Sequence, residues 1–372
     1  MKKFLFIILG ILLIFINQTA IAKDNHLLGK ASNIRYEEVS FGNPQLKQII
    51  DIKILNGESR GSVVQLENIL GTNPYYDINV QENDKIVLLQ ENENGKTNYY
   101  ITDIYRLGAL TFLGALFCIL VLIIGKKKGF FSLISIVLTV GLIFYLLCPL
   151  ILAGISPLFA TLIVSLLSSV ITMYLVGGIN RKSSSAVIGT ISSLTLAGIG
   201  ACATIYFARL TGFSDETTLF LYSSHPELDF TSITASIIIL AALGAVMDIA
   251  MSIASTINEI HINNNNLSTK ELFNAGMNVG RDIIGTMANT LILVYLGGAI
   301  PLLLLAENID AFKFLNLNAV ATEISSALIG SIALLLCVPL TALCAANLIK
   351  KGSKNPENRD IIIPNENIEE IL

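Results

Sequence analysis

Two aspartates in the apolar second half of the chain are the residues best placed to do chemistry. Asp248 stands in residues 244–255 and is followed by Ser252, Ser255 and Glu259 at spacings of four, three and four residues. Such spacing places these side chains on one face of a helix. A carboxylate on an otherwise apolar helix can bind a cation or carry a proton, so this face is our first candidate site.

A second polar face begins at Asp282. Thr286 and Asn289 follow it at spacings of four and three residues. We expect this face to meet the Asp248 face and to line a polar cleft, open to the cytoplasm, that takes a small solute or an ion. A plainer reading leaves Asp248 near a hydrated surface and makes Asn289 a hydrogen-bonding contact between helices.

Other catalytic patterns are weak or missing in the sequence. Two aspartates on neighbouring helices could share a proton, as in intramembrane aspartyl proteases. However, Arg281 replaces the glycine that precedes the aspartate in those enzymes, and no Pro-Ala-Leu motif follows. The sequence has no phosphate-binding loop, and its three histidines are scattered. We therefore expect no enzymatic activity and neither a cofactor nor a metal.

The composition indicates what surrounds these polar faces. The 372 residues are 53% hydrophobic and only 14% charged, and the mean hydropathy is +0.68. Soluble domains carry about 25% charged residues, so we expect the main partner of this chain to be a lipid bilayer. The net charge of −4 leaves no basic surface for phosphates, which excludes a nucleic-acid partner.

Residues 107–349 are predicted to form a polytopic α-helical membrane bundle of about seven spans. A helix needs about 20 predominantly apolar residues to cross the hydrocarbon. Apolar blocks of this kind occur at residues 107–124, 130–148, 157–177, 184–208, 231–256, 283–305 and 324–349.

The positions of the positive charges indicate the orientation of these spans. If residues 23–106 lie outside, the segments facing the cytoplasm hold eleven Lys and Arg residues and the opposite loops hold two. Lysine and arginine favour the cytoplasmic side of a membrane. We therefore expect a multi-pass protein of a bacterial cell membrane, with the N-terminal domain outside and the C-terminal tail in the cytoplasm.

The N-terminal third combines a targeting segment with a polar domain. Residues 1–22 have a basic start, a short apolar stretch and a small-residue cleavage site, which predicts a signal peptide, with an uncleaved anchor as the alternative. Residues 23–106 contain alternating apolar runs and the turn pairs Asn56-Gly57 and Asn94-Gly95. These patterns predict a small β-rich extracytoplasmic domain. The strand candidates are residues 50–54, 63–66, 86–89 and 99–102.

Three further local patterns occur: one before the sixth span, one within it and one in the C-terminal tail. Ser268 and Glu271 have the spacing of a capping box, which predicts a short interfacial helix over residues 269–279. Gly297-Gly298 and Pro301 interrupt the span itself, as in broken helices that line transport sites or in simple kinks. Residues 350–372 are charged and rich in asparagine, which is typical of a flexible tail.

These motifs together resemble the YibE/F family of bacterial membrane proteins. Residues 244–255 around Asp248 and residues 280–297 around Asp282 carry most of the resemblance, which covers roughly residues 45–350. The sequence departs from the family at Asn83, where a glycine is expected. Supporting matches are Asn56, Gly57, Gly61, Asn68, Asp84, Ile104, Tyr105, Arg106 and residues 177–182.

The resemblance implies a multi-pass membrane protein that is often described as permease-like. On this basis we expect a transporter component whose path is lined by Asp248, Asp282 and Asn289. The alternative is a non-catalytic membrane sensor or assembly factor, in which the outer β domain binds an extracytoplasmic protein partner and the helices anchor it.

Overall fold

The computed structural model describes residues 26–41, 43–71, 77–93 and 96–353. The chain forms two compact units, Met1–Lys126 and Lys127–Leu372. The predicted signal peptide, the Asn94-Gly95 pair and most of the predicted tail lie outside the described residues.

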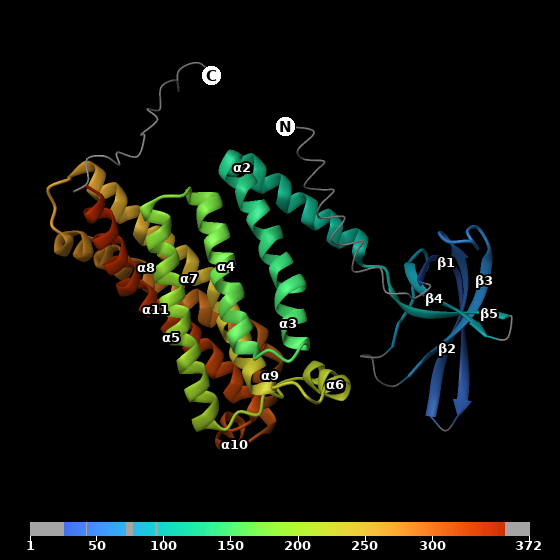
Figure 1. The fold of residues 1–372 in the computed structure, drawn as a ribbon. Helices are drawn as coiled ribbons and strands as arrows, with labels where there is room; N and C mark the ends of the chain where they lie inside the picture. Colours follow the sequence, from blue (N-terminus) through green and yellow to red (C-terminus); the bar gives the residue numbers. More distant parts are fainter. Residues whose placement is uncertain (1–25, 42, 72–76, 94–95, 354–372) are drawn as a thin grey trace, which may run out of the picture. The chain divides into compact units, whose positions relative to one another are not determined.

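The first unit carries a five-stranded antiparallel sheet in the order β3-β2-β1-β4-β5 (Figure 1). All four predicted strand runs fall within β2 to β5 and are confirmed. The sequence pattern misses β1, because residues 35–38 are mostly charged and do not alternate. The strands are β1 His26–Phe41, β2 Asn43–Ile54, β3 Val63–Leu70, β4 Lys85–Glu93 and β5 Lys96–Ile104.

Alternation along β2 builds the core of this sheet. Ile50, Ile52 and Ile54 are buried and pack with Ile86 and Leu88 of β4. Successive side chains of a strand point to opposite faces, so the three isoleucines share one face. That face gives the predicted β domain a continuous apolar core.

A buried amide continues the same face of β2. Gln48 is completely buried, and its Nε2 donates to Asn79 Oδ1 and to the Val80 carbonyl, at 3.0 Å each. Its Oε1 accepts a hydrogen bond of 2.9 Å from Asn68 Nδ2 of β3. The segment that precedes β4 is thereby tied to the two neighbouring strands. The turn that follows this segment contains Asn83, whose φ of 71° lies in the left-handed region that asparagine tolerates better than most residues.

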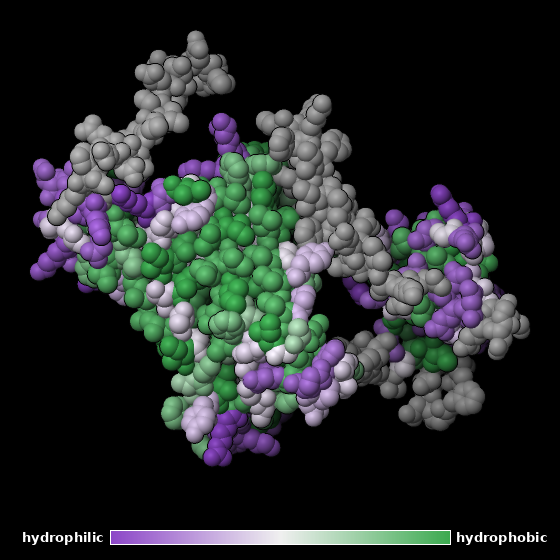
Figure 2. Space-filling view, in the orientation of Figure 1, coloured by the Kyte–Doolittle hydropathy of each residue, from purple (hydrophilic) through white to green (hydrophobic). Residues whose placement is uncertain are grey.

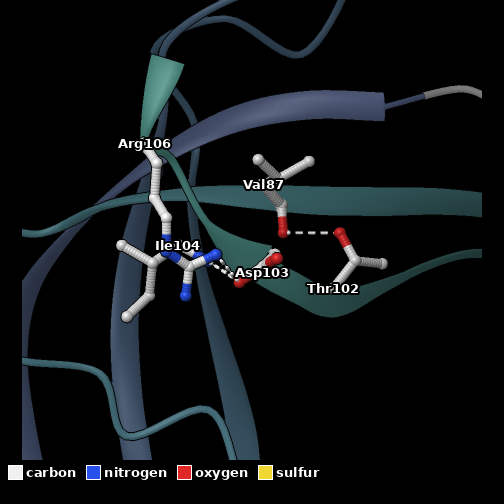
Figure 3. Close-up of polar contacts among 5 residues, drawn as sticks. All are labelled: Val87, Thr102, Asp103, Ile104 and Arg106. Atoms are coloured by element: carbon white, nitrogen blue, oxygen red, sulfur yellow. Dashed lines mark hydrogen bonds and ion pairs between the residues drawn. The ribbon is translucent and has the colours of Figure 1, made fainter. Parts of the chain in front are cut away.

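The end of β5 is fixed by a bulge and a carboxylate (Figure 3). The register shifts at Thr102, whose hydroxyl donates to the Val87 carbonyl across the ladder at 3.0 Å. Asp103 Oδ1 accepts from the Ile104 amide and from Arg106 Nη1, at 2.7 Å each. These contacts order the chain immediately before the first long helix.

That helix, α2 Leu107–Leu142, continues through a π-helical turn at Ile143–Leu147 into α3 Cys148–Leu152. Its geometry breaks at Lys126, where φ is 47° and ψ is −126°. The first two predicted spans therefore form one apolar segment of 46 residues with a break between them.

Six helices of the described residues are long and apolar enough to cross a membrane. The five spans predicted after residue 156 correspond one to one with α4, α5, α7, α8 and α11. Shorter helices fill the connections. The helices are α4 Pro157–Gly177, α5 Arg181–Ala208, α6 Glu216–Ser224, α7 Phe230–Asn263, α8 Thr269–Gly298, α9 Ile300–Leu304, α10 Ala311–Leu315 and α11 Asn318–Ser353.

Two predicted boundaries are wrong. The capping box at Ser268 is present, but the helix that it starts runs without interruption to Gly298, so the separate interfacial helix does not exist. Gly280 does not end the helix, because it packs directly against Val338 of α11. α11 likewise continues to Ser353, so the first residues of the predicted tail are helical. The predicted interruption at Gly297-Gly298 is confirmed, since α8 ends there.

Small residues bring α5, α7 and α11 together at the centre of the second unit. Gly189 of α5 packs against Thr341 of α11, and Gly198 packs against Ile239 of α7. Small side chains allow this close approach, and α5 is rich in glycine, serine and threonine. Figure 2 shows a broad hydrophobic surface over α4 and α5 with hydrophilic groups at both ends, as expected of membrane-embedded helices.

Candidate functional site

The Asp248 face of α7 points away from the protein core. Val246, Ile249 and Ala250 are completely buried on the opposite side of the helix. Asp248 and Ser252 are exposed, as is Glu259, whereas Ser255 is half-buried. The predicted polar stripe therefore exists as one face, which is exposed at Asp248, Ser252 and Glu259 and partly covered at Ser255.

Asp248 lies near the middle of α7. The helix runs to Asn263, well beyond the predicted end of the span at residue 256. Asp248 is therefore 15 residues from the end of the helix, or about 22 Å at 1.5 Å per residue. The added residues include Asn258, Glu259 and His261, so the apolar stretch still ends near residue 256, about 12 Å or two turns beyond Asp248. The reading in which Asp248 lies near a hydrated surface therefore stays open.

The Asp282 face of α8 is also exposed along its length. Asp282, Thr286 and Asn289 are all exposed. α8 packs through its other side, where Gly276 meets Ile257 of α7 and Ala342 of α11. The sequence correctly groups the polar residues of each helix on one face, and the structure adds the direction of that face.

Contacts with α11 place the two aspartates at similar levels. Cys337 Sγ lies 3.5 Å from the Val246 carbonyl oxygen, and Gly280 packs against the next residue, Val338. Asp248 and Asp282 each follow these contacts by two residues, or about 3 Å along their antiparallel helices. Both carboxylates therefore lie within about one helical turn of the same level.

Within the described residues, no hydrogen bond joins the two polar faces. The Ser252 hydroxyl donates to the Asp248 carbonyl at 2.8 Å, and the Thr286 hydroxyl donates to the Ile283 carbonyl at 3.0 Å. Each hydroxyl thus binds a carbonyl of its own helix, which leaves the carboxylates open to a ligand. A cleft formed by both faces stays a prediction.

The site residues carry oxygen atoms that could bind a cation, but the described residues form no preformed metal centre. No group of three or more His, Cys, Asp or Glu residues occurs with metal-binding geometry in the described part of the chain. The chemistry available at the Asp248 face is that of a single carboxylate with neighbouring hydroxyls, which can hold a cation or exchange a proton.

Glu323 and Tyr295 are two further polar side chains in apolar helices, and the sequence reasoning missed both. Glu323 is half-buried in α11, and the Tyr295 hydroxyl of α8 is buried without a hydrogen-bond partner among the described residues. The Tyr295 ring approaches Gly330, two turns along α11 from Glu323. Glu323 directly precedes the predicted span at residues 324–349, so only an earlier helix start, such as the observed Asn318, would have revealed it.

Comparison with known proteins gives matches to two family models. The model described as "YibE/F-like protein" matches residues 113–351, and the model described as "YibE/F family N-terminal domain" matches residues 31–104. No curated protein and no solved structure matches the chain.

Proposed function

The chain belongs to the YibE/F-like family, and from this membership we propose that it is a multi-pass, permease-like membrane protein. Its path for a small solute or ion follows the polar faces of α7 and α8. The residues that line this path are Asp248, Ser252, Ser255, Asp282, Thr286 and Asn289.

The position of Asp248 is the observation that carries this proposal. An ionisable side chain at the centre of a membrane helix costs about 2.5–3.5 kcal/mol on insertion scales. Such a residue is retained where it faces a partner or a water-filled cavity. Asp248 lies within the apolar stretch of α7 and faces away from the buried apolar residues, as a residue that contacts a passing ion would.

We propose that the 46-residue segment Leu107–Leu152 crosses the membrane twice, which gives seven spans. As one helix it would be about 69 Å long, whereas the hydrocarbon is about 30 Å thick. Lys126, Lys127 and Lys128 would then lie within the membrane. A reversal at the non-helical Lys126 places all three lysines in the cytoplasm, and the N-terminal domain outside.

Ligand-dependent stability of the purified full-length protein tests the proposed function. A ligand that binds the folded state raises the apparent melting temperature by mass action. We expect a saturable rise with one class of cation or small solute, and we expect Asp248→Asn to abolish that rise while the abundance of the protein in membranes is unchanged. An identical response in both proteins would remove Asp248 from the mechanism.

A sensor or assembly role is the second candidate, because the edge strand β3 exposes an apolar side chain at each end of its outer face, beyond Gln65 and Glu67. Val63 is 63% exposed and Ile69 is 57% exposed. The Gln48 network holds neighbouring segments rigidly, which suits a surface that docks an extracytoplasmic partner. Loss of a co-purifying protein in a Val63→Lys variant, with the ligand response of Asp248 intact, would favour this role.

A further inference from the structure

Five candidate spans lie wholly within the second unit, and α8 is the least covered of these five. In its most apolar stretch 11% of the residues are buried, compared with 50% in α7 and 56% in α11. Asn278, Arg281 and Asp282 are all exposed on the side opposite Gly280. A helix of this composition needs a polar partner on its uncovered side.

The level of these polar groups lies within the apolar part of the bundle. α11 exposes apolar side chains from Ile324 through Leu328 to Leu343, a length that matches the hydrocarbon. Val338, which packs against Gly280, falls inside this range. Arg281 directly follows Gly280 and therefore lies near the level of Val338. Arg281 Nη1 donates to Asn278 Oδ1 at 3.0 Å, but this contact leaves its charge without an opposite charge. Lipid alone would leave the charges of Arg281 and Asp282 unbalanced at this level, which is unfavourable.

The apolar segment at residues 107–125 cannot provide partners for Arg281 and Asp282. Residues 107–125 contain Thr111 and Cys118 as their only side chains with a polar atom. The Thr111 hydroxyl already donates to the Leu107 carbonyl at 2.6 Å. Whatever covers the exposed side of α8 must therefore carry charged and hydrogen-bonding groups.

The exposed face of α8 has the spacing of a helix–helix seam. Its residues recur every four and three positions, which is the heptad spacing of parallel helix pairs. Gly285 lies in the middle of the seam with nothing within 4 Å of the position of a Cβ atom, so a second helix can approach closely there. The seam consists of Asn278, Asp282, Gly285, Asn289, Ile292 and Leu296.

We propose that this seam binds the α8 seam of a second copy of the chain, and that Arg281 of each copy pairs with Asp282 of the other. Copies inserted in the same orientation are related by a two-fold axis along the membrane normal, so the two α8 helices run parallel. Arg281 and Asp282 are successive residues and lie about 100° apart on the helix, one on either side of the seam centre. A two-fold axis brings each side against the opposite side of the partner helix, which forms two reciprocal ion pairs.

This inference depends on α8 crossing the membrane and does not depend on passage of a solute. It assigns Asp282 and Asn289 to the contact between the copies, so the proposed path would then follow the Asp248 face of α7 beside this contact. The central asparagines, Asn278 and Asn289, would meet their counterparts and fix the register, as a buried asparagine does in parallel coiled coils. Because the face carries one positive and one negative side chain, it is complementary to itself. This favours a second copy of the chain over a partner whose surface carries charge of only one sign.

Cysteine cross-linking of the full-length protein in membranes tests the contact. The background is a variant without the native cysteines, and the test position is Gly285→Cys. We expect a disulfide-linked species of twice the monomer mass after mild oxidation. Met287→Cys is the matched control on the same helix, because its side chain packs against the core. No cross-linking at Gly285→Cys, equal cross-linking at Met287→Cys, or an adduct with a different protein would overturn the proposal.

Charge exchange tests the ion pairs independently of cysteine chemistry. We expect Arg281→Asp and Asp282→Arg, each alone, to weaken dimerisation at least about tenfold, which corresponds to about 1.4 kcal/mol. The variant with both substitutions restores the reciprocal pairs and should recover the dimer. The dimer fraction is measured by stepwise photobleaching of labelled protein in lipid vesicles. Unchanged dimers in the single variants, or no recovery in the double variant, would contradict the proposed pairing.

Discussion

The contact between α5 and α11 makes a quantitative prediction about the bundle. A Cβ atom at Gly189 would overlap Thr341 Oγ1 and would lie 2.8 Å from the Thr341 Cβ and 2.9 Å from its Cα. The last of these atoms belongs to the backbone, so a rotamer change cannot relieve the overlap. Gly189→Ala therefore forces the two helices apart, and overpacking of this kind costs about 1–3 kcal/mol.

Gly200→Ala supplies the matched control on the same helix. Nothing lies within 4 Å of the position of its Cβ atom, so only the higher helix propensity of alanine acts there, worth about 0.5–1 kcal/mol in favour of folding. Because both variants gain this term, it cancels in their difference. We expect Gly189→Ala to be less stable than Gly200→Ala by about 1–3 kcal/mol.

Unfolding of both variants in mixed detergent measures this difference directly. Adding Thr341→Ala to Gly189→Ala removes the closest atom, so part of the lost stability should return. Equal stability of Gly189→Ala and Gly200→Ala would show that α5 and α11 do not pack as described, and the central part of the fold would have to be revised.

Two further predictions concern the β domain. Gln48→Leu should destabilise it by about 2–6 kcal/mol, because the amide and the carbonyl of Val80 both lose Gln48 as their partner and each costs about 1–3 kcal/mol to leave unpaired. Hydrogen exchange of the sheet amides measures the loss, and unchanged protection would contradict the network. Hydrogen bonds from Gln65 and Asn33 lower the pKa of Asp51 below its ordinary value of 3.8. Its charged form therefore adds stability above that value, and this contribution is lost as the pH falls through the lowered pKa. The difference in exchange rates between the wild type and Asp51→Asn should shrink on acidification, and a constant difference would refute this assignment.

Strong local patterns made much of the fold predictable. α4 begins at Pro157 and ends at Gly177, as predicted, because a proline opens the helix and a glycine closes it. Alternation identified four of the five strands. Local pattern did not identify β1, because hydrogen bonds to β2 and β4 hold this strand extended although its own residues do not alternate.

The candidate site was predictable only in part. Periodicity shows that Asp248, Ser252 and Glu259 share a face, but it cannot show which way that face points, because this depends on the helices that pack against the opposite side. The continuity of α8 through Gly280 depends in the same way on Val338, which lies far away in the sequence. Tertiary contacts determine both features.

Water access to the Asp248 face tests the central claim most directly. The experiment places a single cysteine at Ser252 or at Ile199 in a variant without the native cysteines and adds a membrane-impermeant maleimide to either side of sealed vesicles. Ile199 of α5 is 62% exposed on an apolar surface and should stay unreactive in lipid. We predict that Ser252→Cys reacts from the cytoplasmic side much faster than Ile199→Cys. Equal lack of reaction at both positions would contradict a polar path along α7.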